Sequence, residues 1–194
     1  MGTILLINGS PHKNGNTYDA LNIMAQIFLQ NGFNARIIQI GGINIRGCQG
    51  CYQCSKNLNK QCVIQDDLTP IMKECFSDDV EGVVIGSPTY FSNVTTEVKA
   101  FIDRVGYVSK SNGGLLKNKV GTSIAIDRRA GANFVYSAIN FFFGINEMPI
   151  ATSTYWNNGR ACKMGELIKD NEGIQTFGTL AQNMSYLINK LYIK

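Results

Sequence analysis

The sequence predicts a doubly wound α/β fold, a five-stranded parallel sheet between two layers of helices. Short continuous apolar runs occur along the chain, and such runs are typical of strands that are buried on both faces. Segments with apolar residues at helical spacing alternate with these runs five times, which favours right-handed crossovers between parallel strands. Because the 194 residues contain no repeat, linker or low-complexity tract, we expect one domain spanning residues 1–194.

The first half of the chain contributes two strands, two helices and a long irregular segment. Thr3–Asn8 is an unbroken apolar run and predicts a strand. Thr17–Gln30 predicts a helix, because apolar side chains recur at spacings of three and four until an Asn-Gly pair ends the pattern. Ala35–Ile40 predicts the second strand. Residues 41–65 are rich in Gly and Cys and lack periodicity, so they are interpreted as an insertion before a short helix at Leu68–Phe76.

The second half of the chain continues the alternation. Val80–Gly86 and Val120–Asp127 are buried-strand patterns like the first one. Three further segments have apolar residues at helical spacing and predict helices at Thr95–Val105, Ala132–Phe143 and Glu172–Leu191. One more strand-like run predicts the fifth strand, at Met148–Tyr155. Five such strands suit the flavodoxin-like order 2-1-3-4-5, in which ligands bind beyond the carboxyl ends of the strands.

Composition excludes several classes of protein. Hydrophobic residues make up 44% of the chain and charged residues 16%, which argues against disorder. The net charge of +4 comes from scattered basic residues, so no nucleic-acid partner is expected. No apolar stretch reaches about 18 residues, so no membrane partner is expected either. The N-terminal apolar run lacks the basic flank and cleavage site of a signal peptide, and we expect a cytoplasmic protein.

The loop between the first strand and the first helix is a candidate phosphate site. It brings backbone N–H groups and hydroxyls to a helix N-terminus, where the helix dipole favours an anion. The alternative is a plain β–α turn with Thr17 as the N-cap. His12 is interpreted as an exposed loop side chain, and no residue is assigned a catalytic role. The candidate binding residues here are Ser10, Lys13, Asn14, Gly15, Asn16 and Thr17.

The loops after the third and fourth strands are candidates for binding a planar ring. The first of them carries two aromatic residues and a stiffening proline, and the second carries arginines and small residues that permit close approach. The alternatives are aromatic packing under the next helix and an ordinary surface turn. The candidate residues are Pro88, Thr89, Tyr90, Phe91, Asn93, Arg128, Ala130 and Gly131.

With these three loops the chain resembles the NADPH-dependent FMN reductase family of flavodoxin-like proteins. The resemblance is carried by Gly9-Ser10-Pro11, Asn14–Thr17, Gly86–Phe91, Lys99–Arg104 and the run at 128–132. It implies FMN, with the phosphate at Ser10, Asn16 and Thr17, the ring against Pro88–Phe91 and Asn93, and the loop at Arg128–Gly131 closing over it. It also implies NAD(P)H as a possible electron donor.

Four of the six cysteines form a compact cluster. Two successive gaps of two residues let three thiolates converge from one turn, as in iron–sulfur proteins. From spacing alone, iron–sulfur is favoured, with a zinc site or free thiols as alternatives. Cys75 is interpreted as a core thiol and Cys162 as a free thiol in a polar loop. The candidate ligands are Cys48, Cys51, Cys54 and Cys62, which follow the second strand on the edge of the ring-binding loops.

In this motif the chain is similar to the iron–sulfur flavoprotein subgroup of the family, which has an acidic pair like Asp66-Asp67 after its cysteines. This resemblance implies a 4Fe–4S cluster beside FMN and a homodimer or homotetramer in which cluster and flavin are close across subunits. Two alternatives remain open. One is an electron carrier reduced by ferredoxin without NAD(P)H activity, and the other is a zinc- or thiol-based redox sensor with a vestigial flavin site.

Overall fold

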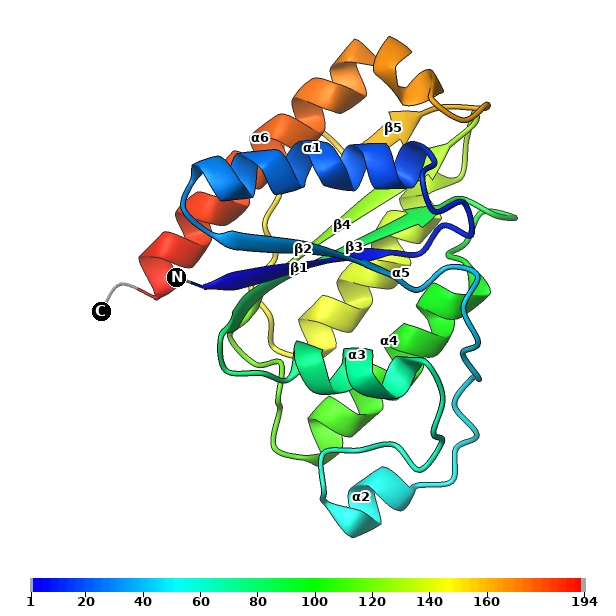
Figure 1. The fold of residues 1–194 in the computed structure, drawn as a ribbon, viewed down its shortest axis with the longest axis vertical. Coiled ribbons are helices and arrows are strands. Elements are labelled where there is room, and N and C mark those ends of the chain that lie inside the picture. Colours follow the sequence, from blue (N-terminus) through cyan, green and yellow to red (C-terminus); the bar gives the residue numbers. More distant parts are fainter. Residues whose placement is uncertain (1, 193–194) are drawn as a thin grey trace.

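The computed structural model of the protein describes residues 2–192. Its centre is one five-stranded sheet in the order β2-β1-β3-β4-β5, and neighbouring strands pair in parallel (Figure 1). Both the order and the parallel pairing confirm the sequence-based expectation. The order reverses between β1 and β3, so the loops that follow these two strands leave the sheet side by side. The strands are β1 Thr3–Asn8, β2 Asn34–Gln39, β3 Val80–Pro88, β4 Val120–Asp127 and β5 Asn158–Arg160.

Helices cover both faces of the sheet, as expected (Figure 1). Side chains of β1 alternate between two hydrophobic clusters, because successive residues of a strand point to opposite faces. Ile4 and Leu6 pack with α1 and α6, whereas Leu5 and Ile7 pack with α3, α4 and α5. The helices are α1 Asn16–Gln30, α2 Gln53–Asn57, α3 Leu68–Cys75, α4 Thr96–Ser111, α5 Ala132–Ile145 and α6 Asn171–Leu191, with a 3₁₀ turn η1 at Glu166–Lys169.

The fifth strand lies further along the chain than the sequence predicts. Within the expected strand, Met148–Tyr155, only the segment around Ile150 touches the sheet, as an isolated bridge to Gly121 at the start of β4. The chain then leaves the sheet through polar residues 152–154, which cannot be buried without partners. It returns at β5, where Gly159 fits closely against Leu167 and Phe177. The prediction of a strand at 148–155 is therefore wrong, although a fifth strand exists.

Residues 41–65 are mostly irregular, as expected, but contain the short helix α2. This helix begins after Tyr52 and ends before Leu58, both in the left-handed backbone region, with φ of 57° and 50°. In Figure 1 the segment leaves the end of β2 and runs down to α2 at the lower end of the molecule. None of the helices within residues 2–192 is long and apolar enough to cross a membrane.

Candidate flavin and cysteine sites

A cavity of about 520 Å³ lies at the carboxyl edge of the sheet. Three of its walls are the loops that the sequence singled out, after β1, β3 and β4. A fourth wall comes from the segment that follows β5. The whole cavity is lined by Ser10, His12, Gly15, Asn16, Thr17, Pro88, Thr89, Tyr90, Ile126, Arg128, Ala161, Cys162 and Met164.

The β1–α1 loop presents an uncapped helix N-terminus to this cavity. Gly15 is the N-cap of α1 and supplies no side-chain hydrogen bond to the first turn. The first N–H groups of a helix have no carbonyl partner within the helix, so they are available to an anion. Ser10 is buried and held in place, because its N–H donates to Asn8 Oδ1 at 3.1 Å and its Oγ accepts from the N–H of His12 at 3.2 Å. These groups fit a phosphate.

The side chain of Asn16 has a different task from the one the sequence suggests. Its Nδ2 donates to the carbonyl of Lys163 at 2.9 Å, and its Oδ1 accepts from the N–H of Leu167 at 3.1 Å. The amide therefore fastens the segment after β5 to the first turn of α1. What Asn16 offers to a phosphate is its backbone N–H.

The β3–α4 loop brings Pro88, Thr89 and Tyr90 to the cavity. Its tip is a tight turn in which the backbones of Tyr90 and Asn93 exchange two hydrogen bonds of 3.0 Å. Phe91 lies at this tip with a left-handed φ of 48° and is fully exposed, so it points away from the lining. Within residues 2–192, the buried Oγ1 of Thr89 has no hydrogen-bond partner. An unpaired hydroxyl in the wall of a cavity is a site for a polar group of a ligand.

The loops after β3 and β4 are packed against each other. Gly131 has a φ of +98°, and a Cβ added there would lie 2.7 Å from Ser92 Oγ and 3.1 Å from Thr89 Cγ2. Glycine is therefore required at this position both by the backbone conformation and by the contact. Gly131 supports the lining without being part of it.

The structure separates the predicted flavin residues into two sets. The first set lines the cavity and consists of Ser10, Gly15, Asn16, Thr17, Pro88, Thr89, Tyr90 and Arg128. The second set lies on the same loops but outside the lining, and consists of Lys13, Asn14, Phe91, Asn93, Ala130 and Gly131.

Sequence reasoning missed the wall formed by Ala161, Cys162 and Met164. These residues follow the true fifth strand, which the sequence places too early. The sequence predicts that Cys162 is a free thiol in a polar loop. It is free and exposed, and it also lines this cavity. Glu166 shapes the segment by accepting from the N–H groups of Cys162 and Lys163 at 3.2 and 2.8 Å.

The four clustered cysteines line a second, smaller cavity of about 130 Å³. Cys48 and Cys51 are exposed, and Cys54 and Cys62 are half-buried. Burial raises the pKa of the Cys54 thiol. Within residues 2–192, no three Cys, His, Asp or Glu side chains are gathered closely enough to hold one metal ion. The cavity is lined by Cys48, Gln49, Gly50, Cys51, Tyr52, Cys54, Cys62, Val63, Ile64, Arg104, Tyr107 and Val108.

The donor set of this second cavity fits an iron–sulfur cluster in kind, because four thiols face one largely apolar space. The loop that carries them is supported by α4 and by Asn112, the C-cap of that helix. Asn112 Oδ1 accepts from the N–H of Lys60 at 2.9 Å, and the rings of Tyr52 and Tyr107 meet edge to face at 5.9 Å. Cys75 is buried in the core, as expected, and does not contribute to the cavity.

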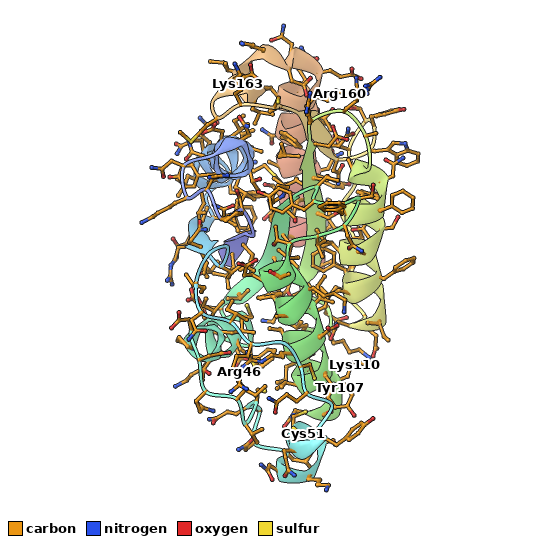
Figure 2. The ribbon with its side chains drawn as sticks, turned by 90° about the vertical axis from the view of Figure 1, so that its right-hand side faces the viewer. Arg46, Cys51, Tyr107, Lys110, Arg160 and Lys163 are labelled. Atoms are coloured by element: carbon orange, nitrogen blue, oxygen red, sulfur yellow. The ribbon has the colours of Figure 1, made fainter. Side chains whose placement is uncertain are left out.

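The two cavities share no lining residue. The expectation that the cysteines lie on the edge of the flavin loops stays a prediction, because the cysteine cavity is lined by α4 and by residues between 48 and 64 and by none of those loops. Residues 41–52 start at the carboxyl end of β2 and run down to α2 (Figure 1), and Arg104, Tyr107 and Val108 of α4 form one wall of the cysteine cavity. Figure 2 shows Cys51 and Tyr107 near one end of the molecule and Arg160 and Lys163 near the other.

A further cavity of about 620 Å³ lies between residues 59–65 and α3. Cys62 is its only link to the cysteine site among the residues described. The rest of the lining is a mixture of polar and apolar side chains from Asn59 to Ser77, and no carboxyl-edge loop contributes to it. Thr69 and Pro70 from the first turn of α3 belong to this lining, but the cavity lacks the convergence of carboxyl-edge loops that suits a flavin.

Comparisons with known proteins agree with these features. Residues 3–162 match the family model described as NADPH-dependent FMN reductase. An iron–sulfur flavoprotein of Methanocaldococcus jannaschii is 31% identical over 180 residues, which covers 87% of this chain and 88% of the relative.

Two solved structures share the fold. RosB with a bound intermediate, 8-demethyl-8-formylriboflavin-5′-phosphate, superposes with a TM-score of 0.75 at 15% identity, covering 100% of this chain and 81% of RosB. A flavodoxin from the domain Archaea superposes with a TM-score of 0.57 at 11% identity, covering 94% of this chain and 98% of the flavodoxin. Together with the sheet order and the carboxyl-edge cavity, these matches show that the chain belongs to the NADPH-dependent FMN reductase family, a family of flavodoxin-like oxidoreductase flavoproteins.

Proposed function

We propose that the protein binds FMN in the 520 Å³ cavity and acts as an oxidoreductase that passes electrons from a reduced donor through the flavin. The observation that carries this proposal is the uncapped N-terminus of α1 at one side of a cavity whose opposite wall is formed by the β3–α4 loop. The family match and the flavin phosphate held by a protein of the same fold support it.

The residues of the cavity have separate roles in this proposal. The first N–H groups of α1 and the Ser10 hydroxyl bind the phosphate, where the helix dipole stabilises negative charge. Thr89 offers its unpaired hydroxyl to a polar edge of the ring, and Tyr90 excludes water. Arg128 adds positive charge beside a ring that gains electrons.

FMN, when bound, supplies the one- and two-electron redox chemistry, including acceptance of hydride. The chain therefore needs no side-chain acid or base for hydride acceptance, and we assign no catalytic residue. The electron donor in this proposal is NADH or NADPH, which the family name favours. Reduced ferredoxin as the donor would make the protein a carrier rather than a nicotinamide-dependent enzyme.

We further propose that Cys48, Cys51, Cys54 and Cys62 bind a 4Fe–4S cluster. The support is their shared cavity, their spacing and the iron–sulfur flavoprotein relative. Thiolate ligands of this kind suit the reducing cytoplasm, where we expect the protein to act. A zinc-loaded or metal-free thiol sensor is the competing interpretation of the same residues.

The separation of the two cavities favours a homodimer or homotetramer. Within one chain Cys51 of the cysteine loop lies toward one end of the molecule, and Arg160 and Lys163, which flank the Cys162 wall of the flavin cavity, lie toward the other (Figure 2). The two cavities share no lining residue, so one chain alone does not join them. In a symmetric assembly, the cysteine loop of one copy can approach the flavin cavity of another. Sedimentation of the cofactor-loaded protein tests this, and a monomer would contradict it.

The deciding experiment is anaerobic purification followed by an absorption spectrum and assays for flavin, iron, sulfide and zinc. FMN at about one per chain, with iron and sulfide in equal amounts, is the expected result. Stoichiometric zinc without flavin would overturn the proposal and favour the sensor. Mixing the oxidised protein with NADPH, NADH or reduced ferredoxin then identifies the donor, because only a competent donor bleaches the flavin absorbance.

A pair of cysteine variants separates the two cofactors. Cys54→Ala is expected to lose the iron, the sulfide and the cluster absorbance while keeping FMN, because Cys54 lines only the smaller cavity. Cys162→Ala is the matched control, since Cys162 lines the flavin cavity instead, and it is expected to keep its iron. Full iron content in Cys54→Ala would show that the ligand assignment is wrong.

A further inference from the structure

Arg104 of α4 is a fully buried cation in the wall of the cysteine cavity. Its side chain is 0% exposed and that of its partner Asp66 is 3% exposed, with Nη1 2.5 Å from Asp66 Oδ2. Burial opposes the charge of Arg104, and the ion pair with the buried Asp66 carboxylate compensates it. Arginine is rarely buried without a specific reason.

The guanidinium joins the two ends of the cysteine loop. Nη1 donates to the carbonyl of Arg46 at 3.0 Å, and Nη2 donates to the carbonyl of Ile64 at 2.9 Å. Arg46 comes two residues before Cys48, and Ile64 comes two residues after Cys62. We call these two ends, residues 44–46 and 64–67, the neck of the cysteine loop.

Two carboxylates complete the neck. Asp66 Oδ2 also accepts from the N–H of Arg46 at 2.9 Å, and its Oδ1 accepts from the N–H of Leu68 at 3.1 Å. Asp67 Oδ2 accepts from the N–H of Asn44 at 3.0 Å. Because Arg104 comes from the core helix α4, it fixes the neck to the body of the protein as well as closing it.

One hydrogen-bond donor of the Arg104 guanidinium is left without an acceptor in the part of the chain that the structure describes. Within residues 2–192, its buried Nε has no hydrogen-bond partner. Four cysteine thiolates around an iron–sulfur cluster carry net negative charge, which increases when the cluster is reduced, and a buried cation stabilises the more negative state more. The Asp66 carboxylate offsets part of the positive charge of Arg104. Its two oxygens, however, accept from the N–H groups of Arg46 and Leu68 on the neck side.

We propose that Arg104 is a positioning residue for the four-cysteine site, which closes the neck of the cysteine loop and raises the reduction potential of the cluster held there. This inference rests on the proposed function. It assigns to a buried arginine two effects, one on the conformation of the loop and one on the electron affinity of the cluster. A merely structural arginine would have only the first.

Three variants test the inference in the full-length, anaerobically prepared protein. Arg104→Met removes the charge and the hydrogen bonds, and Arg104→Lys keeps the charge but cannot bridge both carbonyls. Lys110→Met is the matched control, because Lys110 lies on the same helix but is exposed and pairs with Glu147, which is not part of the neck. Iron and sulfide content, FMN content and a potentiometric titration followed by electron paramagnetic resonance are measured for each.

Arg104→Met is expected to keep FMN, to lose part of its iron and to be harder to reduce. At the potential that half-reduces the wild-type cluster, its ratio of reduced to oxidised cluster is expected to be at least tenfold lower, a shift of about 59 mV for one electron. Arg104→Lys is expected to lose iron with a smaller shift, and Lys110→Met to behave as wild type. A wild-type potential in Arg104→Met would overturn the inference.

Hydrogen exchange in cluster-free protein separates this inference from the proposed function. If wild-type protein holds no iron, the proposed cluster fails, but the neck can still be measured at the amides of Arg46 and Leu68. Arg104→Met is expected to exchange these amides at least tenfold faster than Lys110→Met, and equal rates overturn the inference. If Arg104→Met does not fold, Arg104→Lys decides by the same measurement, and wild-type exchange in that variant overturns the inference.

Discussion

The side-chain amide of Asn16 binds the backbone of Lys163, 147 positions away in the sequence, with Nδ2 2.9 Å from the carbonyl oxygen. A second bond from the N–H of Leu167 to Asn16 Oδ1 completes the attachment. One wall of the flavin cavity is thus held by a residue of the phosphate loop. Binding of the phosphate and placement of the wall that contains Cys162 are therefore coupled through one side chain.

Asn16→Ala is expected to weaken FMN binding about tenfold, because two hydrogen bonds of about 0.5–1.5 kcal/mol each that hold the wall are lost. Fluorescence titration of the flavin-free protein measures the Kd. Asn31→Ala is the matched control, since the side chain of Asn31 joins the other end of α1 to Gln182 and Ser185 on α6. Equal FMN affinity in the two variants would contradict the coupling.

Gly131→Ala is expected to lower the free energy of unfolding by about 1–3 kcal/mol and to weaken FMN binding. The substitution places a Cβ 2.7 Å from Ser92 Oγ at a φ of +98°, so the two loops beside the cavity must move apart. Denaturant unfolding and FMN titration measure the two effects. Gly113→Ala shares the left-handed backbone but meets nothing within 4 Å, so it is expected to lose stability only.

Thr89→Val is expected to affect the flavin-bound and flavin-free proteins differently. Without FMN, removal of an unpaired buried hydroxyl leaves thermal stability unchanged or slightly raised. With FMN, loss of a hydrogen bond of about 1 kcal/mol lowers affinity about fivefold. Thr89→Ser keeps the hydroxyl and is expected to bind FMN nearly as wild type. The same Kd in Thr89→Val and wild type would exclude a contact of this hydroxyl with the flavin.

Cys75 is expected to resist alkylation in the native protein, because burial, aided by Glu74, raises the pKa of its thiol to about 12. The unfolded thiol ionises near pH 8.5. Since the unfolded state loses this proton first, Cys75 makes stability fall as pH rises from about 8.5 toward 12. Mass spectrometry after iodoacetamide treatment of cluster-free protein measures the alkylation of Cys75, and the exposed Cys162 is expected to react first. Denaturant unfolding between about pH 8 and pH 10 measures the fall in stability. Comparable rates at the two thiols would contradict the burial.

The sheet could be predicted because its central strands are apolar on both faces. All residues of β1 and β4 are buried, and β1 is an apolar run from Ile4 to Ile7, whereas β4 also buries Thr122, Ser123 and Asp127. The strand β5 is different, because Asn158-Gly159-Arg160 has no strand-forming composition. Its place is set by the hydrogen bonds from the N–H of Ala125 to Asn157 O and from the N–H of Ala161 to Asp127 O, at 2.9 and 2.8 Å. Such a strand exists only in its tertiary context.

The sequence predicts that the three loops line one cavity, but it does not predict which side chains face that cavity. Parallel strands bring their following loops to one edge, and this rule located Ser10, Thr89 and Arg128 correctly in the lining. Which residues of a loop point inward depends on the turn within it. The left-handed backbone at Phe91 directs that ring outward, and no local sequence signal indicates this for a phenylalanine.

The spacing of the cysteine motif predicts a shared site for its four thiols, but it does not predict how far that site lies from the flavin loops. Spacing places thiols near one another along the chain, and all four do face one cavity. The path of the cysteine loop away from the sheet depends on contacts with α4 and its C-cap, such as the Tyr52–Tyr107 ring pair and the bond from the N–H of Lys60 to Asn112. These partners are about fifty residues apart in sequence, and their pairing leaves no periodic pattern.

The closed neck makes the cysteine loop a replaceable module. Arg46 and Ile64 both bind the same guanidinium, so the chain enters and leaves the loop at nearly one point. The entropy of closing a loop changes only slowly with its length when its ends are already joined. Residues 47–63 can therefore be shortened, lengthened or exchanged for another metal-binding loop while the sheet and the flavin cavity keep their register, which makes this neck a natural graft point for protein engineering.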